Sequence, residues 1–225
     1  GWPARADGAG VALQPVNPFG DLEDPTNWIA GSELGGTPGA DAVPRDFGVV
    51  INEVLTHTDP PVTDSIELLN TTPVNVDIGG WYLSDSSGNL KFQIPAGTTI
   101  GAGDYLVFDE DDFNPSGGTD PQDFALSSAH GDNVWLIASD GGQLWLQDYV
   151  EFGGALNGES FGRWPNAGGA LYPMTAATLG AANSGPRVGP LVISEVMYSS
   201  GESGGTDALE FIEIHNPTSA AVDLT

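Results

Sequence analysis

Two glutamates lie at matching places in two similar stretches of this sequence, and carboxyl groups are side chains that can do chemistry. Glu53 and Glu67 lie in apolar segments that read as strands, and they recur as Glu195 and Glu213. If the two segments of each pair run side by side, the carboxylates could bind a metal ion or act as general acid and base. The alternative is that each carboxylate accepts hydrogen bonds that fix a corner of the fold. The recurrence favours this structural interpretation, because repeated modules share first the residues that fold them.

A run of acidic residues gives a second candidate site. Asp109, Asp111 and Asp112 stand in a segment that is also rich in Gly and Pro. Oxygen ligands on a flexible loop suit Ca²⁺, so these three aspartates are the candidate metal ligands. The regular spacing of an EF-hand loop is absent, and a run of charges is more often a solvated loop. We therefore expect no cofactor, or Ca²⁺ alone.

Residues that usually carry catalysis are scattered along the chain. His57, His130 and His215 are isolated, without the spacing of a zinc site or a catalytic triad. The chain contains no cysteine, which excludes disulfides, thiolate zinc sites and thiol catalysis. It also lacks the Gly-x-Ser-x-Gly elbow and the Gly-rich phosphate loop. We expect that this chain is not an enzyme.

Aromatic residues suggest a binding function instead. Exposed rings on a β-sheet can stack on sugars, and Trp28 and Trp145 lie near predicted loops. These two are the candidate carbohydrate-binding residues. Trp81 lies in an alternating apolar pattern, which core packing explains more simply.

Turn-forming residues punctuate the whole chain. It has 32 Gly and 17 Pro, and they separate short runs of aliphatic and aromatic residues. This pattern predicts an all-β fold, and no stretch holds a helical apolar period for long enough to predict a helix. Residues 109–123 are expected to form a surface loop. Alternating side chains such as Leu83, Trp135 and Ile137 predict a core between two packed sheets. The predicted strands cover residues 49–55, 65–70, 76–78, 81–84, 91–94, 105–108, 133–138 and 144–150.

Part of the sequence is repeated. Residues 49–55 return as 191–197, and residues 66–70 return as 212–216, so that Asn70 corresponds to Asn216. Upstream of each copy, Thr37-Pro38-Gly39-Ala40 resembles Thr178-Leu179-Gly180-Ala181, and residues 10–13 resemble residues 158–161 more loosely. The order of these echoes indicates one complete repeat and two partial ones.

The echoes also set the expected domain boundaries. We expect residues 1–46 to be the C-terminal part of a preceding repeat, followed by a linker. Residues 47–187 are expected to form a complete β-sandwich. Residues 188–225 are expected to be the first strands of a following repeat, truncated before its later strands.

The motifs of the complete repeat resemble a known family. They are Val-Ile-Asn-Glu-Val (50–54), Ile-Glu-Leu-Leu-Asn (66–70), Val-Asp-Ile-Gly-Gly-Trp-Tyr-Leu-Ser-Asp (76–85), Phe-Gln-Ile-Pro-Ala-Gly-Thr-Thr-Ile (92–100) and Gly-Glu-Ser-Phe-Gly-Arg (158–163). In this order they resemble bacterial lamin tail domains, over residues 47–183. The resemblance implies an immunoglobulin-like β-sandwich, here one complete module flanked by two partial modules. It also implies tandem repetition in secreted or surface-anchored proteins.

The charge of the chain limits its partners and its location. With 31 acidic and 5 basic residues, the formal net charge is −26. Nucleic-acid binding needs cations that neutralise phosphates, and an anionic membrane surface would repel this chain. We therefore expect no nucleic-acid partner and no membrane insertion. An acidic composition with a single lysine is typical of solubility in salt water, where charges are screened. This predicts an extracellular or cell-surface location in a marine or halophilic bacterium.

Two functions remain open from the sequence. The first is a non-catalytic structural or adhesive module whose partners are other copies of itself or adjacent repeats. Such modules could assemble into a stalk, layer or filament by completing each other's sheets. The alternative is an accessory module that binds extracellular polysaccharide, or another substrate, for a larger secreted enzyme.

Overall fold

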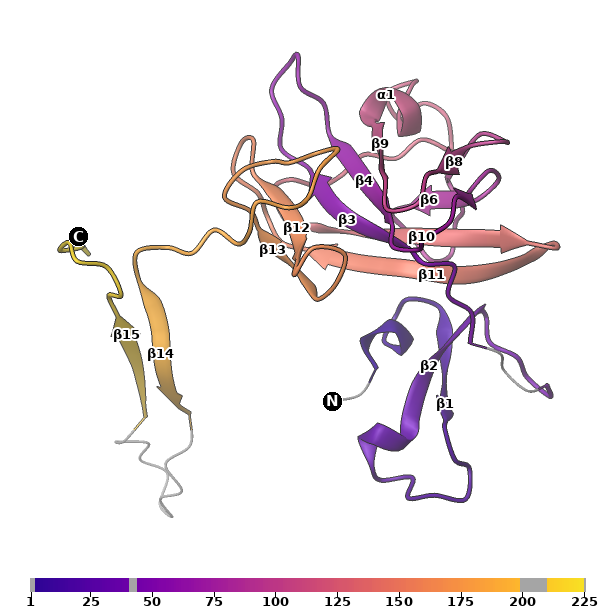
Figure 1. The fold of residues 1–225 in the computed structure, drawn as a ribbon, viewed down its shortest axis with the longest axis horizontal. Helices are drawn as coiled ribbons and strands as arrows, with labels where there is room; N and C mark the ends of the chain where they lie inside the picture. Colours follow the sequence, from indigo (N-terminus) through magenta and orange to yellow (C-terminus); the bar gives the residue numbers. More distant parts are fainter. Residues whose placement is uncertain (1–2, 41–43, 199–209, 225) are drawn as a thin grey trace. The chain divides into compact units, whose positions relative to one another are not determined.

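The computed structural model describes residues 3–40, 44–198 and 210–224 of the chain. These residues fall into two compact units, Gly1–Pro186 and Arg187–Thr225. Figure 1 shows the fold of each unit.

The first unit is an antiparallel β-sandwich, so the predicted all-β, immunoglobulin-like fold is confirmed (Figure 1). One sheet has the strand order β13-β12-β3-β4-β9, with bounds Ala170–Pro173, Ser160–Trp164, Val49–Leu55, Ser65–Asn70 and Tyr105–Asp109. The other sheet has the order β1-β2-β11-β10-β6-β7, with bounds Val11–Pro15, Trp28–Leu34, Gln143–Phe152, Asp132–Asp140, Tyr82–Ser84 and Phe92–Gln93. The small elements are β5 (Val76–Asp77) paired with β8 (Thr99–Ile100), and the 3-10 turns η1 (Ala4–Ala6) and η2 (Pro25–Asn27).

One apolar core lies between the two sheets. Ile51, Ile66 and Leu68 come from the five-stranded sheet, and Leu83 and Leu136 come from the six-stranded sheet. All five side chains are fully buried. Burying a side chain of this size stabilises the folded state by roughly 1.5–3 kcal/mol, before the cost of ordering it. A core of this kind explains how the sandwich is stable without disulfide bonds.

The strand β10 has apolar side chains on both faces, and this corrects the prediction of a single core. Leu136 points into the sandwich, although the alternation that predicted Trp135 and Ile137 in the core leaves Leu136 on the opposite face. Trp135 and Ile137 point to the opposite face, where they pack with Ala9 and Val11 in a second cluster. The prediction was wrong for these two residues because the N-terminal segment covers the outer face of this sheet.

The N-terminal hairpin β1–β2 is held on the sandwich by backbone and side-chain contacts. Glu33 of β2 pairs with Trp145 of β11. Arg5 donates to the backbone oxygen of Leu146, and Arg45 forms an ion pair with Asp140. Residues 3–40 therefore fold with the complete sandwich as one unit.

The predicted loop 109–123 contains a short helix, α1 (Glu110–Phe113), which corrects that prediction. Asp109 caps this helix in a capping box with Asp112. Phe113 is fully buried and stacks on Phe124, with ring centroids 4.7 Å apart. The acidic composition of the segment predicted only a solvated loop. Composition does not show that one aromatic side chain, Phe113, is buried and anchors the segment.

The second unit contains one hairpin, β14 (Val192–Met197) paired with β15 (Phe211–His215). Its strand residues are mostly exposed, including large apolar side chains on both strands.

Candidate functional site

Glu53 and Glu67 are directly opposed on β3 and β4, and both side chains are fully buried. Glu53 accepts hydrogen bonds from the Ser160 hydroxyl, from the Thr178 backbone N–H at 2.9 Å and from the Thr178 hydroxyl at 2.8 Å. Glu67 accepts a hydrogen bond from the Gly180 backbone N–H. The two carboxylates thus bind residues 178–180, which follow the last strand of the sandwich. We call Glu53, Glu67, Thr178 and Gly180 the carboxylate clasp.

Three asparagines extend the carboxylate clasp. Asn52 is the extra residue of a β-bulge in β3, and its amide donates to Glu67 at 2.8 Å. The Asn183 amide donates to the backbone oxygen of Asn52 at 3.0 Å, and the Asn183 N–H donates to Asn166 at 3.0 Å. A Cβ at Gly162 would lie 2.8 Å from the Asn183 amide, so the close approach of this segment to β12 requires glycine. The closing segment is therefore held by side chains as well as by backbone.

The electrostatics of the carboxylate clasp follow from its burial. Burial raises the pKa of Glu67 to about 7, hydrogen bonds from Asn52 and Gly180 oppose this, and the nearby Glu53 carboxylate adds to it. A general acid or base must come within hydrogen-bonding distance of its substrate. Neither carboxylate is exposed, and both bind donors of the chain itself. The geometry suits closing the fold rather than acting on an external molecule.

A buried ion pair connects the two sheets. Arg163 on β12 donates to both carboxylate oxygens of Asp148 on β11, at 2.9 and 2.8 Å. The Ile51 N–H donates to Asp148 at 2.8 Å, and Arg163 Nε donates to the Ile51 backbone oxygen at 2.8 Å. Burial raises the pKa of Asp148, while the Arg163 charge and these hydrogen bonds lower it. The positive charge of Arg163 thus compensates the negative charge of the Asp148 carboxylate inside the sandwich.

The hairpin β14–β15 has the same strand register as β3–β4. Each hairpin has a β-bulge just before its first glutamate, Glu53 or Glu195, and each sets that glutamate opposite the second, Glu67 or Glu213. Ser194 occupies the bulge position of the second hairpin, and its hydroxyl donates to Glu213. In the first hairpin, the bulge residue likewise donates to the second glutamate. The two hairpins that are similar in sequence therefore also share their strand register and their β-bulge.

The strands β4 and β15 also end in the same turn. The Asn70 amide donates to the backbone oxygen of Val74 at 2.7 Å, and the Asn216 amide donates to that of Ala220 at 2.7 Å. In the sandwich, Asn70 is fully buried and also bonds the backbone oxygens of Ile100 and Gly101. Asn216 has the same local turn on an exposed hairpin.

The two hairpins differ in what covers them. Ile51 and Ile66 are 0% exposed, whereas the corresponding Ile193 and Ile212 are 66% and 63% exposed. Within the described residues, β14 and β15 pair only with each other. The second hairpin therefore presents an apolar face that the first hairpin buries.

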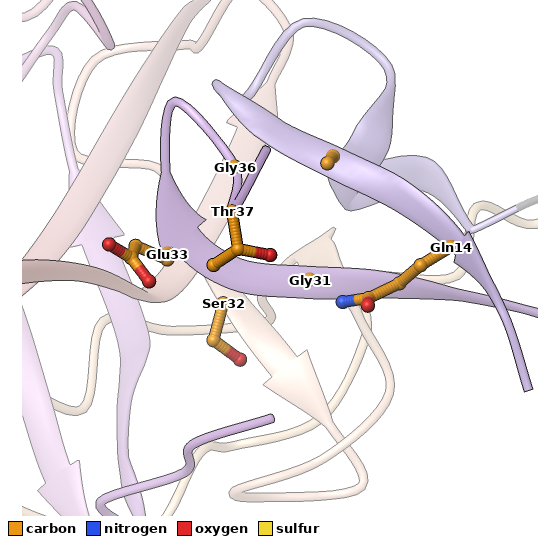
Figure 2. A pocket seen from close by; sticks show the side chains of 7 residues that line it. Gln14, Gly31, Ser32, Glu33, Gly36 and Thr37 are labelled. Atoms are coloured by element: carbon orange, nitrogen blue, oxygen red, sulfur yellow. The ribbon is translucent and has the colours of Figure 1, made fainter. Parts of the chain in front are cut away.

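A turn beside β1 matches the turn that binds the buried glutamates. Ala40 N–H donates to the Thr37 oxygen at 3.0 Å, as Ala181 N–H does to the Thr178 oxygen at 2.9 Å. The third residue of each turn is a glycine in the left-handed region, with φ of 82° at Gly39 and 85° at Gly180. Thr37, Gln14 and Gly31 line one cavity between the turn and the hairpin β1–β2. Figure 2 shows this cavity with its lining side chains. Glu33 also lines this cavity (Figure 2), and its carboxylate accepts a hydrogen bond from the Gln143 amide at 3.2 Å.

Two of the three candidate metal ligands, Asp109 and Asp112, use their carboxylates to cap α1, and Asp111 contributes its backbone N–H. Asp109 accepts a hydrogen bond from the Asp111 N–H at 3.0 Å, and Asp112 accepts one from the Asp109 N–H at 3.2 Å. Across the described ranges, no group of three or more His, Asp or Glu side chains is arranged to hold a metal ion.

The candidate carbohydrate-binding tryptophans are placed differently from each other. Trp145 is only 8% exposed, and the Arg45 guanidinium lies over its ring at 4.7 Å from the centroid. Trp28 is half-buried, and its indole N–H donates to the Leu22 backbone oxygen at 3.0 Å. In this arrangement, Trp145 does not offer an open ring face to a sugar. Trp81, expected in the core, is 3% exposed and packs edge-on against Phe47.

Several residues of the site had no signal in the sequence. Asn183 and Asp148 bind partners more than ten residues away along the chain, and each is a common polar residue without a motif of its own. Ser160 lies in the motif of residues 158–163, but the motif does not show that its hydroxyl donates to Glu53. Thr178 did belong to a recognisable echo, with Thr37. That echo could have indicated a shared turn, although not which side chain it binds.

The comparisons with known proteins identify part of the chain. The family model described as Lamin Tail Domain matches residues 45–153. No curated protein and no solved structure matches the chain. No helix in the described ranges is long and apolar enough to cross a membrane.

Proposed function

Residues 45–153 of this chain belong to the lamin tail domain family, whose members are non-catalytic, immunoglobulin-like structural modules, and from this premise we propose an assembly function. The chain is a structural or adhesive protein built from tandem modules. Neighbouring modules complete each other's sheets, in the same polypeptide or in another copy. The product is a stalk, layer or filament outside the cell.

The observation that carries this proposal is the exposed hairpin β14–β15. It has the register, bulge and terminal turn of β3–β4, yet Ile193 and Ile212 face solvent where Ile51 and Ile66 face a core. Exposed apolar side chains and open strand edges favour pairing with another chain. The match between the two hairpins supports tandem repetition, because register and bulges depend on the same side-chain pattern.

The charge supports an extracellular location in salty surroundings. Two copies with a net charge of −26 repel each other strongly at low ionic strength. Screening shortens this repulsion to about 10 Å at 0.1 M salt and about 3 Å at 1 M. Strand pairing acts at contact, so salt favours the assembly.

Sedimentation velocity over a wide concentration range, in low and high salt, tests this proposal. We expect the mean sedimentation coefficient to rise with concentration, and to rise more in high salt. Negative-stain images of the high-salt sample should show chains of modules. A single monomeric species at all concentrations in both salts would overturn the assembly function.

A further inference from the structure

We infer that the Thr37–Ala40 turn and the outer edge of β1 form the receptor for the β14–β15 hairpin of a second copy, with Glu195 and Glu213 as the carboxylates that the turn binds. This inference rests on the proposed assembly and specifies its contact. The carboxylate clasp, which joins the corresponding parts within one chain, is the template for this contact.

The donor side of the contact is already folded. The Thr37–Ala40 turn shares its internal hydrogen bond and its left-handed glycine with the Thr178–Ala181 turn. In the carboxylate clasp, the donors are the threonine N–H and hydroxyl and the glycine N–H. Among the described residues, the corresponding groups of Thr37 and Gly39 donate to no protein acceptor. Thr37 lines the cavity of Figure 2, with Gly39 two residues further along the same turn, so these donors are available to a carboxylate.

The acceptor side is folded as well. Glu195 and Glu213 are opposed on adjacent strands, as the two glutamates of the clasp are. Both are exposed, and within the described residues β14 is free on the edge that corresponds to the paired edge of β3. Two carboxylates on directly opposed residues of adjacent strands match a turn whose donors, Thr37 and Gly39, are two residues apart, as in the carboxylate clasp.

The strand order gives the docking register. In the sandwich, β12 lies between β13 and β3, with Phe161 opposite Val54 and Gly162 opposite Glu53. The hairpin β1–β2 corresponds to β12–β13, and β1 has its second edge free within the described part of the chain. The same order across two copies is β2-β1-β14-β15. It places Leu13 opposite Val196 of the other copy.

One difference sets the expected strength of the contact. Ala12 stands where Ser160 stands in the sandwich, by the alignment of residues 10–13 with 158–161. Glu195 would therefore receive two of the three hydrogen bonds that Glu53 receives. The contact between copies is accordingly weaker than its template, which suits a joint between modules.

Disulfide trapping in the full-length chain tests the register. The wild-type chain has no cysteine, so a bond between Leu13→Cys in one copy and Val196→Cys in another reports only this pair. Opposed residues of antiparallel strands have Cα atoms about 4.5–5.5 Å apart, which suits a disulfide. We expect the mixed single variants to form a covalent heterodimer under mild oxidation. Phe19→Cys mixed with Val196→Cys is the control, because Phe19 is 97% exposed and lies outside the contact.

Charge-neutral variants test the carboxylates. Glu195→Gln should weaken association about 10-fold to 100-fold, because hydrogen bonds to a charged acceptor are lost. Thr37→Ala should weaken it from the other side, and the double variant should lose less than the two effects combined. Glu23→Gln is the matched control on an exposed loop. It removes the same charge, so relief of repulsion should leave its association equal or slightly stronger.

The outcomes separate this inference from the proposed function. If copies associate but neither trapping nor Glu195→Gln gives the expected result, another surface joins them and this inference is wrong. If the copies never associate, both the proposed assembly and this inference are overturned. Selective trapping of the Leu13→Cys variant with the Val196→Cys variant, together with loss of association in both Glu195→Gln and Thr37→Ala, would establish it.

Discussion

Glu67 is a buried carboxyl group that binds the chain 113 residues further on, through the Gly180 N–H. Its other oxygen accepts from Asn52, and Glu53 lies opposite on the next strand. These donors hold it in place, while burial and the neighbouring carboxylate disfavour its charge. A residue that could have been a catalytic acid is thus used to close the fold.

The pH dependence of stability should reveal this group. Its pKa rises from 4.5 to about 7 on folding, so the folded chain retains a proton that the unfolded chain releases. The stabilisation from Glu67 is complete below the unfolded pKa, and it is lost as the pH rises through about 7. We therefore expect the free energy of unfolding to fall between about pH 5 and about pH 8. Urea denaturation across this range measures it.

The variant Glu67→Gln isolates the contribution of this residue. The amide does not titrate, so the fall with pH should be shallower by about 1–3 kcal/mol across the same range. Glu151→Gln, at an exposed position on β11, is the control and should keep the wild-type slope. An unchanged slope in Glu67→Gln would contradict the raised pKa.

The buried pair of Asp148 and Arg163 allows a second prediction. Arg163→Met should lower the free energy of unfolding by about 3–5 kcal/mol, because it leaves Asp148 buried without its partner. Adding Asp148→Asn should recover part of that loss, since the amide oxygen can still accept from Ile51. Additive losses in the double variant, measured by denaturant unfolding, would show that the pair is not coupled.

At the scale of elements, the sequence predicted long strands such as β3 and β11 and also two-residue strands such as β5 and β7. All eight predicted strands overlap a strand of the structure, with shifts of one or two residues at their ends. The strands β12 and β13 were missed because glycine and proline, which are turn signals in the sequence pattern, stand within them at Gly162 and Pro173. The N-terminal hairpin was missed because its strands bury side chains only on the outer face of a sheet, which local patterns do not show.

The helix α1 was missed for a different reason. Four residues cannot show a helical period, and only the cap at Asp109 and the buried ring of Phe113 hold this turn. Equally, the sequence could suggest calcium ligands in this run but could not show that the carboxylates of Asp109 and Asp112 already accept backbone hydrogen bonds.

The capping box at Asp109 should contribute measurably to the stability of the fold. Asp109→Ala should lower the free energy of unfolding by about 1 kcal/mol, through loss of the cap. Adding Ca²⁺ or a chelator should leave the melting temperature of the wild-type chain unchanged. A calcium-dependent rise in the melting temperature that Asp109→Ala abolishes would contradict the capping role.

At the scale of the whole molecule, the chain holds two copies of one hairpin, β3–β4 and β14–β15. The sequence echo indicated that two hairpins correspond, and the structure gives them the same register, bulge and turn. The pattern could not show which of them is covered, because burial depends on strands that are distant in the sequence. The contrast between a buried and an exposed copy of one hairpin is what motivates assembly.

Hydrogen exchange of the backbone amides tests strand complementation most directly, because pairing consists of backbone hydrogen bonds. In high salt, we expect exchange to slow with increasing concentration at residues 11–14 of β1 and 192–197 of β14. Amides of β10, already paired on both sides, should keep the same exchange at every concentration. If the β1 and β14 amides exchange equally fast in dilute and concentrated samples, the chains do not join through these edges, which contradicts strand complementation between β1 and β14.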